Sequence, residues 1–266
     1  MAKVVLKKQT SQLADNLVLV PGGPGLSPLS FEPLLASLEG MNVYFYYPTG
    51  TYEGSDGGNF SYTEQRDDLL EAISSLTNIT LCGHSFGGIL AVDVFLNDSS
   101  NIDSFICIAS PFSQAAFESV NERFSEHETN EQKTKAESYQ DDPTDNTYRE
   151  WFASCAPHYF AYNNAKQGEK MLFSDKVSSK AFIEAREEAS QKENLLEKLQ
   201  QKPCKKLFLA GEKDNLLPPE VLRKDSKHGD FEFKMIEGAG HFVHFDCPQA
   251  SAEQINNFIS KKGGKS

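Results

Sequence analysis

Ser85 occupies the most suggestive chemical setting in this sequence. It lies within Gly83-His84-Ser85-Phe86-Gly87, after the apolar run 79–82 and before a segment typical of a helix. A serine on so tight a strand-to-helix turn has a strained backbone and close neighbours, and the flanking glycines remove side chains that would clash. The pattern predicts that Ser85 is a nucleophile. The N–H of Phe86, at the start of the helix, is then placed to stabilise a developing oxyanion.

A glycine-rich loop lies upstream of this serine. The apolar run 16–20 leads into Pro21-Gly22-Gly23-Pro24-Gly25, where a backbone N–H can approach a substrate carbonyl without obstruction. We take Gly23 as the second oxyanion donor. A plain turn of glycine and proline is the alternative interpretation.

A carboxylate and a histidine follow later apolar runs, in the order that a nucleophile-acid-base triad has in one class of fold. Asp214 comes after the run 205–210 and His241 after the run 231–236. In such a triad, His241 takes the proton of Ser85 and Asp214 fixes the imidazole tautomer, so the reaction passes through an acyl-enzyme. Two rivals stay open, Glu212 as the acid and His244 as the base.

Short apolar runs alternate with segments of helical pattern, which predicts an α/β fold with a doubly wound, mostly parallel sheet. The expected strands are 16–20, 42–47, 79–82, 104–109, 205–210 and 231–236, with room for one strand before them. The expected helices are 31–38, 63–76, 87–96 and 248–261.

The alternation stops after residue 112 and resumes at 203. We therefore predict a core of residues 1–112 and 203–266, and a helical cap or lid of residues 113–202, called the insertion below. A helix is expected at 182–189 and a break at 141–146. The aromatic residues of the insertion either line a partly hydrophobic pocket or pack the cap on the core. They are Trp151, Phe152, Tyr159, Phe160 and Tyr162.

Composition limits the partners and the compartment. The 266 residues carry a net charge of −12, which disfavours nucleic acid and anionic membranes, since both are bound largely by neutralising phosphates. Five scattered cysteines predict free thiols. No histidine pair has the spacing of a metal site, so we expect neither metal nor cofactor. The charged start of the chain and the lack of a long apolar segment lead us to expect a cytoplasmic protein.

With these motifs in place, the chain resembles the α/β-hydrolase superfamily from about residue 16 to its end. The loop 21–25 looks most like the His-Gly-Gly-Pro-Gly segment of the proline iminopeptidase-like branch, although position 21 is proline. The resemblance implies Ser85, Asp214 and His241 as the triad, Gly23 and Phe86 as the oxyanion hole, and the insertion as a lid.

The leading hypothesis is a cofactor-free serine hydrolase that cleaves a small ester, thioester or amide, with a small molecule or short peptide as substrate. Three alternatives remain, namely an iminopeptidase-like aminopeptidase, an acyltransferase, and a ligand-binding protein of negligible turnover.

Overall fold

One sheet of seven strands organises the computed structural model, which describes residues 2–11, 14–192 and 194–260. The spatial order is β1-β3-β2-β4-β5-β6-β7, and only β1 runs antiparallel to its neighbour. The expected mostly parallel sheet is thereby confirmed. The strands are β1 (Lys3–Lys8), β2 (Asn16–Val20), β3 (Asn42–Tyr47), β4 (Ile79–His84), β5 (Ile102–Ile108), β6 (Lys205–Gly211) and β7 (Glu232–Ile236).

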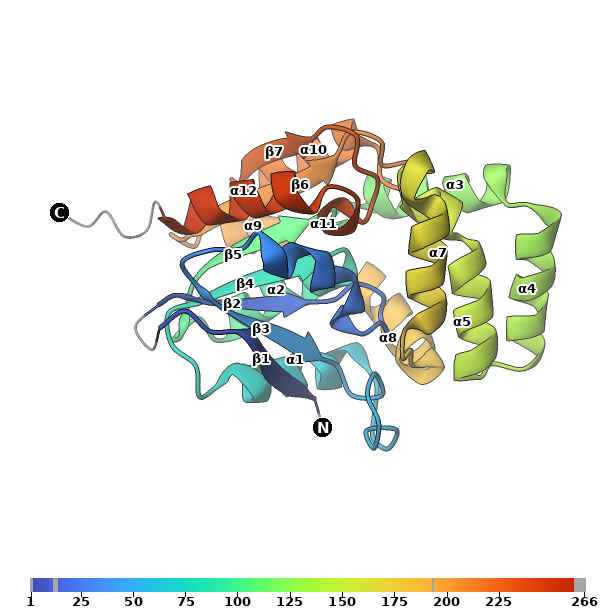
Figure 1. The fold of residues 1–266 in the computed structure, drawn as a ribbon, viewed down its shortest axis with the longest axis horizontal. Coiled ribbons are helices and arrows are strands. Elements are labelled where there is room, and N and C mark those ends of the chain that lie inside the picture. Colours follow the sequence, from blue (N-terminus) through green and yellow to red (C-terminus); the bar gives the residue numbers. More distant parts are fainter. Residues whose placement is uncertain (1, 12–13, 193, 261–266) are drawn as a thin grey trace.

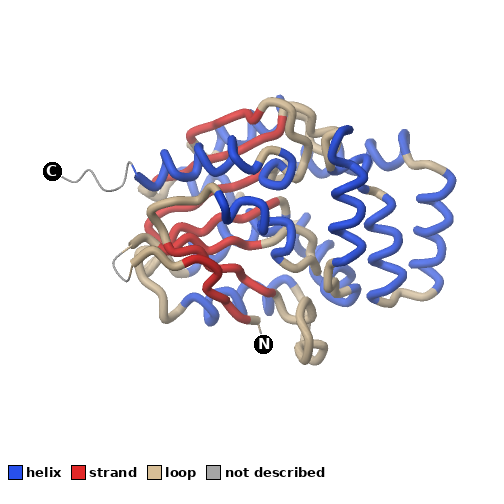
Figure 2. Tube along the Cα trace, viewed as in Figure 1, coloured by secondary structure: helices blue, strands red, loops and turns tan. Residues whose placement is uncertain are grey.

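Helices cover both faces of the sheet, as a doubly wound fold requires (Figure 2). One layer holds α1 (Tyr62–Ile73), α2 (Phe86–Asn97), α9 (Leu195–Gln200) and α10 (Pro219–His228). The other holds the 3-10 helix η1 (Pro28–Ala36), α11 (Val243–Asp246) and α12 (Pro248–Ser260). No helix in the described ranges combines the length and apolar character needed to cross a bilayer.

The register of the parallel strands brings their carboxyl ends to one edge. Gly83 of β4 pairs with Val20 of β2 on one side and with Cys107 of β5 on the other. Leu209, two positions before the end of β6, pairs with Ile108. The loops that follow these strands therefore meet at the same edge, where a parallel sheet presents its functional residues.

Most helices that lie between β5 and β6 in the chain stand beyond this edge, on the side toward which the strands point (Figure 1). They are α3 (Gln114–His127), α4 (Asn130–Asp141), α5 (Asp145–Ser154), α6 (Ala156–Tyr159), the 3-10 turn η2 (Tyr162–Asn164), α7 (Ala165–Ser174) and α8 (Ser179–Ser190). The last helix of this stretch, α9, lies instead in the layer with α2 and α10. The division into a core and a lid stays a prediction. Residues 1, 12, 13 and 261–266 of the predicted core and 193 of the insertion lie outside the described residues.

The expected elements differ from the observed ones mainly where proline or polarity obscures the pattern. The helix expected at 31–38 is the 3-10 helix η1, because Pro33 lies inside it and cannot donate a helical hydrogen bond. Helix α10 was not predicted, because it is short and mostly polar, and its buried residues are few, namely Leu222, Asp225 and Ser226. Residue 261, the expected end of the last helix, lies outside the described residues, and α12 ends at Ser260.

Candidate active site

Ser85 joins β4 to α2 with φ +50° and ψ −121°, a backbone conformation that a residue with a side chain rarely adopts. Its N–H donates to the carbonyl oxygen of Ile108 at 2.8 Å, which ties the turn to β5. The Ser85 side chain makes no helix-capping bond and is half-buried. The turn therefore holds the hydroxyl at the sheet edge without committing it to a structural role.

Close backbone packing explains the glycines on either side of Ser85. A Cβ atom on Gly83 would lie 2.2 Å from the carbonyl oxygen of Gly87. One on Gly87 would lie 2.3 Å from the carbonyl oxygen of Pro21. Real Cβ atoms do not approach backbone so closely, so both positions require glycine for the turn to close.

Asp214 and His241 are hydrogen-bonded as the triad interpretation requires. His241 Nδ1 lies 3.0 Å from Asp214 Oδ2, and both side chains are buried. The other oxygen, Oδ1, accepts the backbone N–H groups of Leu216 and Leu217 at 2.9 and 2.8 Å. The carboxylate is thus fixed from two sides, and it can hold one orientation of the imidazole ring.

Both rival residues have other contacts. The exposed Glu212 accepts the N–H of Gly238 through Oε2 at 3.0 Å, and so links the turn after β6 to the loop after β7. His244 is buried, with Nε2 3.0 Å from Ser30 Oγ and its ring stacked on Phe31 at 4.2 Å between centroids. Burial lowers the pKa of His244 to about 3, so it is neutral and packed. In the described part of the chain, neither residue forms a hydrogen bond to Ser85, although the His244 ring packs edge-on against His84 at 4.7 Å between centroids.

Ser85 and His241 meet at the same edge, but in the described chain no hydrogen bond joins them directly. Their segments are connected by His84, whose Nε2 lies 3.1 Å from the carbonyl oxygen of His241. Burial, with the charge effects of His244 and His241, holds the pKa of His84 well below its usual range. A neutral His84 that donates from Nε2 therefore positions the backbone of His241 against the serine turn.

The two expected oxyanion donors belong to the loop after β2 and to the first residue of α2. In the described part of the chain, the N–H groups of Gly23 and Phe86 have no hydrogen-bond acceptor. Gly23 is half-buried with φ +119°. A Cβ atom on its neighbour Gly22 would lie 3.3 Å from Ser85 Cβ and 2.8 Å from His84 Nδ1. The glycine-rich loop therefore runs directly against the serine turn.

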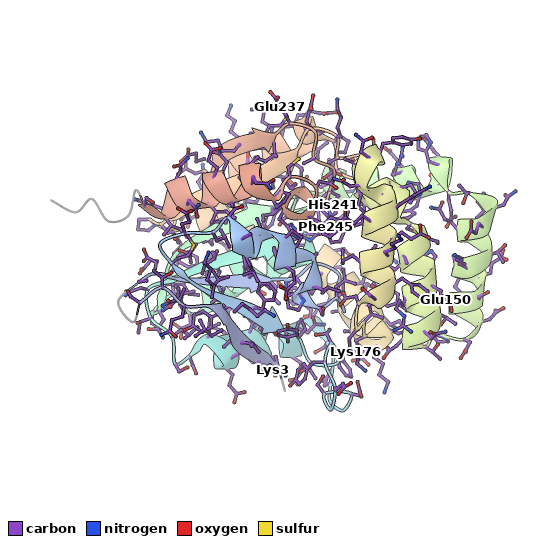
Figure 3. All side chains as sticks on the ribbon, viewed as in Figure 1. Lys3, Glu150, Lys176, Glu237, His241 and Phe245 are labelled. Carbon is purple, nitrogen blue, oxygen red and sulfur yellow. The ribbon has the colours of Figure 1, made fainter. Side chains whose placement is uncertain are left out.

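The insertion is hydrogen-bonded to the segment around His241, residues 240–246. The carbonyl oxygen of Tyr159 accepts the N–H of His241 at 2.7 Å. Asp246 Oδ2 accepts the N–H groups of Gly240 at 2.7 Å and Ala161 at 2.8 Å, and its Oδ1 accepts Asn164 Nδ2 at 2.9 Å. In Figure 3, the labelled His241 and Phe245 lie at the boundary between the sheet and the inserted helices. The inserted chain thus helps to hold His241 in place.

The aromatic residues singled out in the insertion divide between two environments. Phe152 and Phe160 are buried with Leu26, Phe242 and Phe245, so they pack the insertion onto the rest of the fold. Tyr159 is half-buried, with its ring centroid 5.9 Å from that of His241. Trp151 is half-buried and stacks on Tyr139. Tyr162 is 95% exposed, so the expectation that it lines a pocket is wrong.

Sequence reasoning missed residues that restrain the site through contacts between distant parts of the chain. His84 lies within the serine motif, and this position was its only signal. Asp246 bonds a residue 85 positions away, and Ser27 bonds Asp175, which is 148 positions away. Such pairings join the edge of the sheet to the insertion, and no local sequence pattern predicts them.

Comparisons with known proteins agree with this architecture. Residues 17–254 match the alpha/beta hydrolase family. A thermophilic esterase from Thermogutta terrifontis is similar in structure, with a TM-score of 0.74 at 18% identity over 98% of this chain and 93% of that one. MenH from S. aureus has a TM-score of 0.73 at 17% identity, over 98% and 99% of the two chains. An esterase from Exiguobacterium antarcticum has a TM-score of 0.69 at 18% identity, over 97% and 94%. No curated protein matched the chain.

Proposed function

This chain belongs to the alpha/beta hydrolase family, and on that basis we propose that it is a cofactor-free serine hydrolase with an acyl-enzyme intermediate. The observation that carries the proposal is the buried hydrogen bond of 3.0 Å between Asp214 and His241, at the sheet edge that also presents Ser85. A buried acid that orients a histidine beside a strained serine is the arrangement that activates a weak nucleophile.

In the proposed reaction, Ser85 Oγ forms a bond to the substrate carbonyl carbon while its proton passes to His241 Nε2. The π electron pair of the carbonyl moves onto its oxygen, and the N–H groups of Gly23 and Phe86 stabilise that negative charge. Asp214 accepts the Nδ1 proton of His241 in a hydrogen bond and stabilises the imidazolium. The electron pair on the oxyanion then re-forms the C=O bond, the bond between the carbonyl carbon and the alcohol oxygen breaks, and the leaving alcohol takes the proton from Nε2. Water repeats the sequence on the acyl group, with Ser85 Oγ as the leaving group, and so releases the acid and the free enzyme.

A small ester is the substrate class that the site supports best. An aminopeptidase would also have to hold a charged amino group, for which a free buried carboxylate is the natural partner. Among the described residues of the insertion, Asp175 is the one fully buried carboxylate, and both of its oxygens already bond Ser27. We propose that the insertion acts as a lid that selects among small acyl substrates.

Three measurements test the proposal. A fluorophosphonate probe should label Ser85 in the folded protein and leave Ser85→Ala unlabelled. Steady-state assays should give a higher kcat/KM for p-nitrophenyl acetate than for a prolyl arylamide. A prolyl arylamide that equals or exceeds the best aryl ester would assign the iminopeptidase activity instead. Faster capture of the acyl group by an added amine or alcohol than by water would indicate an acyltransferase. A folded wild-type chain that is neither labelled nor active would indicate a ligand-binding protein.

A further inference from the structure

The glycine-rich loop after β2 is held on its outer side by the insertion. We use the term oxyanion loop for residues 22–27. Asp175 lies 3% exposed in the connection between α7 and α8, where one carboxylate oxygen accepts the Ser27 N–H at 3.2 Å. Its other oxygen accepts the Ser27 hydroxyl. The carbonyl oxygen of Gly25 accepts the N–H of Ser178 at 2.8 Å. Tyr148 of α5 donates its hydroxyl to the carbonyl oxygen of Pro24 at 3.3 Å.

The residues that make these contacts are themselves fixed. Asp175 is the C-cap of α7, and its N–H donates to the carbonyl oxygen of Leu172. Ser178 is the N-cap of α8, and its side chain accepts the N–H of Ala181. The C-terminus of α7 and the N-terminus of α8 therefore both contact the oxyanion loop, and the connection between them is only a few residues long.

The oxyanion loop packs closely against the connection between α7 and α8. A Cβ atom on Gly25, where φ is +87°, would lie 2.3 Å from the carbonyl oxygen of Ser178. A Cβ atom on Gly50, in the loop that follows β3, would lie 2.7 Å from Ser178 Oγ, so Ser178 is also confined from this side. On its inner side the loop meets the serine turn, through the contact of Gly22 with His84 and Ser85. The backbone that carries the Gly23 N–H is thus confined between the serine turn and the insertion.

We propose that Asp175 and Tyr148 are positioning residues for the oxyanion hole, so that the insertion helps to set the geometry of acyl transfer as well as covering the site. The inference rests on the proposed function. A donor contributes most when its N–H is already aimed at the oxygen that becomes charged, and small displacements weaken it. The contacts on Pro24, Gly25 and Ser27 restrain the chain immediately after Gly23. Loss of these contacts should therefore reduce turnover more than substrate binding.

The test compares Asp175→Asn and Tyr148→Phe with the matched control Tyr139→Phe. The Tyr139 hydroxyl bonds Ser179 Oγ at 3.1 Å in the same aromatic cluster, and among the described residues it forms no hydrogen bond to residues 22–27. With an aryl ester we expect kcat to fall about 10-fold or more in the two loop variants, against 10²–10³ for outright removal of one oxyanion donor. We expect KM to stay within about twofold. The control should keep wild-type kcat.

A thionoester separates a displaced hole from general destabilisation, because sulfur accepts hydrogen bonds more weakly than oxygen. We expect the ratio of oxo-ester to thionoester kcat/KM to fall in Asp175→Asn and Tyr148→Phe and to stay unchanged in Tyr139→Phe. Equal ratios in all three variants and the wild type would overturn the inference.

Hydrogen exchange tests the restraint without any reliance on catalysis. Peptides that cover residues 22–27 should exchange faster in Asp175→Asn than in the wild type and in Tyr139→Phe. Unchanged exchange would overturn the inference even if the esterase activity is real. A wild-type protein with neither labelling nor hydrolysis would refute the proposed function, whereas faster loop exchange would still show that the insertion restrains the loop.

Discussion

Replacement of Asp214 by asparagine should change which nitrogen of His241 carries the proton. Asp214 Oδ1 accepts two backbone N–H groups, from Leu216 and Leu217. An asparagine oxygen is needed at that position, so the amide NH₂ must take the place of Oδ2, 3.0 Å from His241 Nδ1. There it donates to Nδ1 and moves the ring proton to Nε2. The opposite orientation would leave two buried N–H groups unpaired, at a cost of about 2–6 kcal/mol if each lost bond costs roughly 1–3 kcal/mol.

A histidine protonated at Nε2 cannot accept the proton of Ser85. We therefore expect kcat of Asp214→Asn for p-nitrophenyl acetate to fall by about 10⁴, which corresponds to ~5 kcal/mol of transition-state stabilisation at roughly 1.36 kcal/mol per tenfold. The matched control is Glu212→Gln, which changes an exposed carboxylate that bonds only Gly238 and Lys213. It should keep kcat within about twofold, as surface changes usually do. A folded Asp214→Asn protein with kcat within tenfold of wild type, or an equal loss in Glu212→Gln, would refute this reasoning.

Three further outcomes follow from the same geometry. Ser85→Gly should abolish fluorophosphonate labelling and raise the free energy of unfolding in urea by about 1 kcal/mol, because glycine relieves the strain at φ +50° and no capping bond is lost; a lower stability would contradict this. Gly22→Ala should lower kcat/KM at least about tenfold, because its Cβ would lie 2.8 Å from His84 Nδ1. Gly57→Ala, where a Cβ meets nothing within 4 Å, should not. Burial raises the pKa of Asp175 to about 7, with Ser27, the Lys176 N–H and Arg149 opposing the shift. The folded state therefore binds more protons than the unfolded state between about pH 4 and pH 7, so urea stability should fall across that window as pH rises, and less steeply in Asp175→Asn; parallel profiles would exclude this assignment.

Most strands of the sheet could be predicted from the sequence because they are short apolar runs with clear limits. The expected bounds of β2 and β3 agree with the observed ones, Asn16–Val20 and Asn42–Tyr47. The neighbourhood of Ser85 could be foreseen for a similar reason, since the strained turn needs glycines at Gly83 and Gly87, and these appear in the sequence as a fixed pattern.

Other parts of the molecule depend on contacts that no window of sequence contains. Helix η1 has buried residues in a helical pattern, but its internal proline makes it a 3-10 helix. The partners of Asp246 and Asp175 are set by how the insertion lies on the sheet edge. Nothing in the local sequence distinguishes these hydrogen-bonded carboxylates from the many solvated acidic residues around them.

The shared carboxylate of Asp246 also limits how such a protein can be redesigned. Substrate range in a lidded enzyme is often pictured as a property of an exchangeable module. Here one side chain of α11 bonds Gly240 beside the base and also Ala161 and Asn164 of the insertion. A chimera that carried a foreign insertion would leave the half-buried Asp246 with part of its hydrogen bonds unmade, which destabilises the carboxylate and loosens the segment that carries His241. New specificities should therefore be sought by changes within the insertion that retain the segment 159–164.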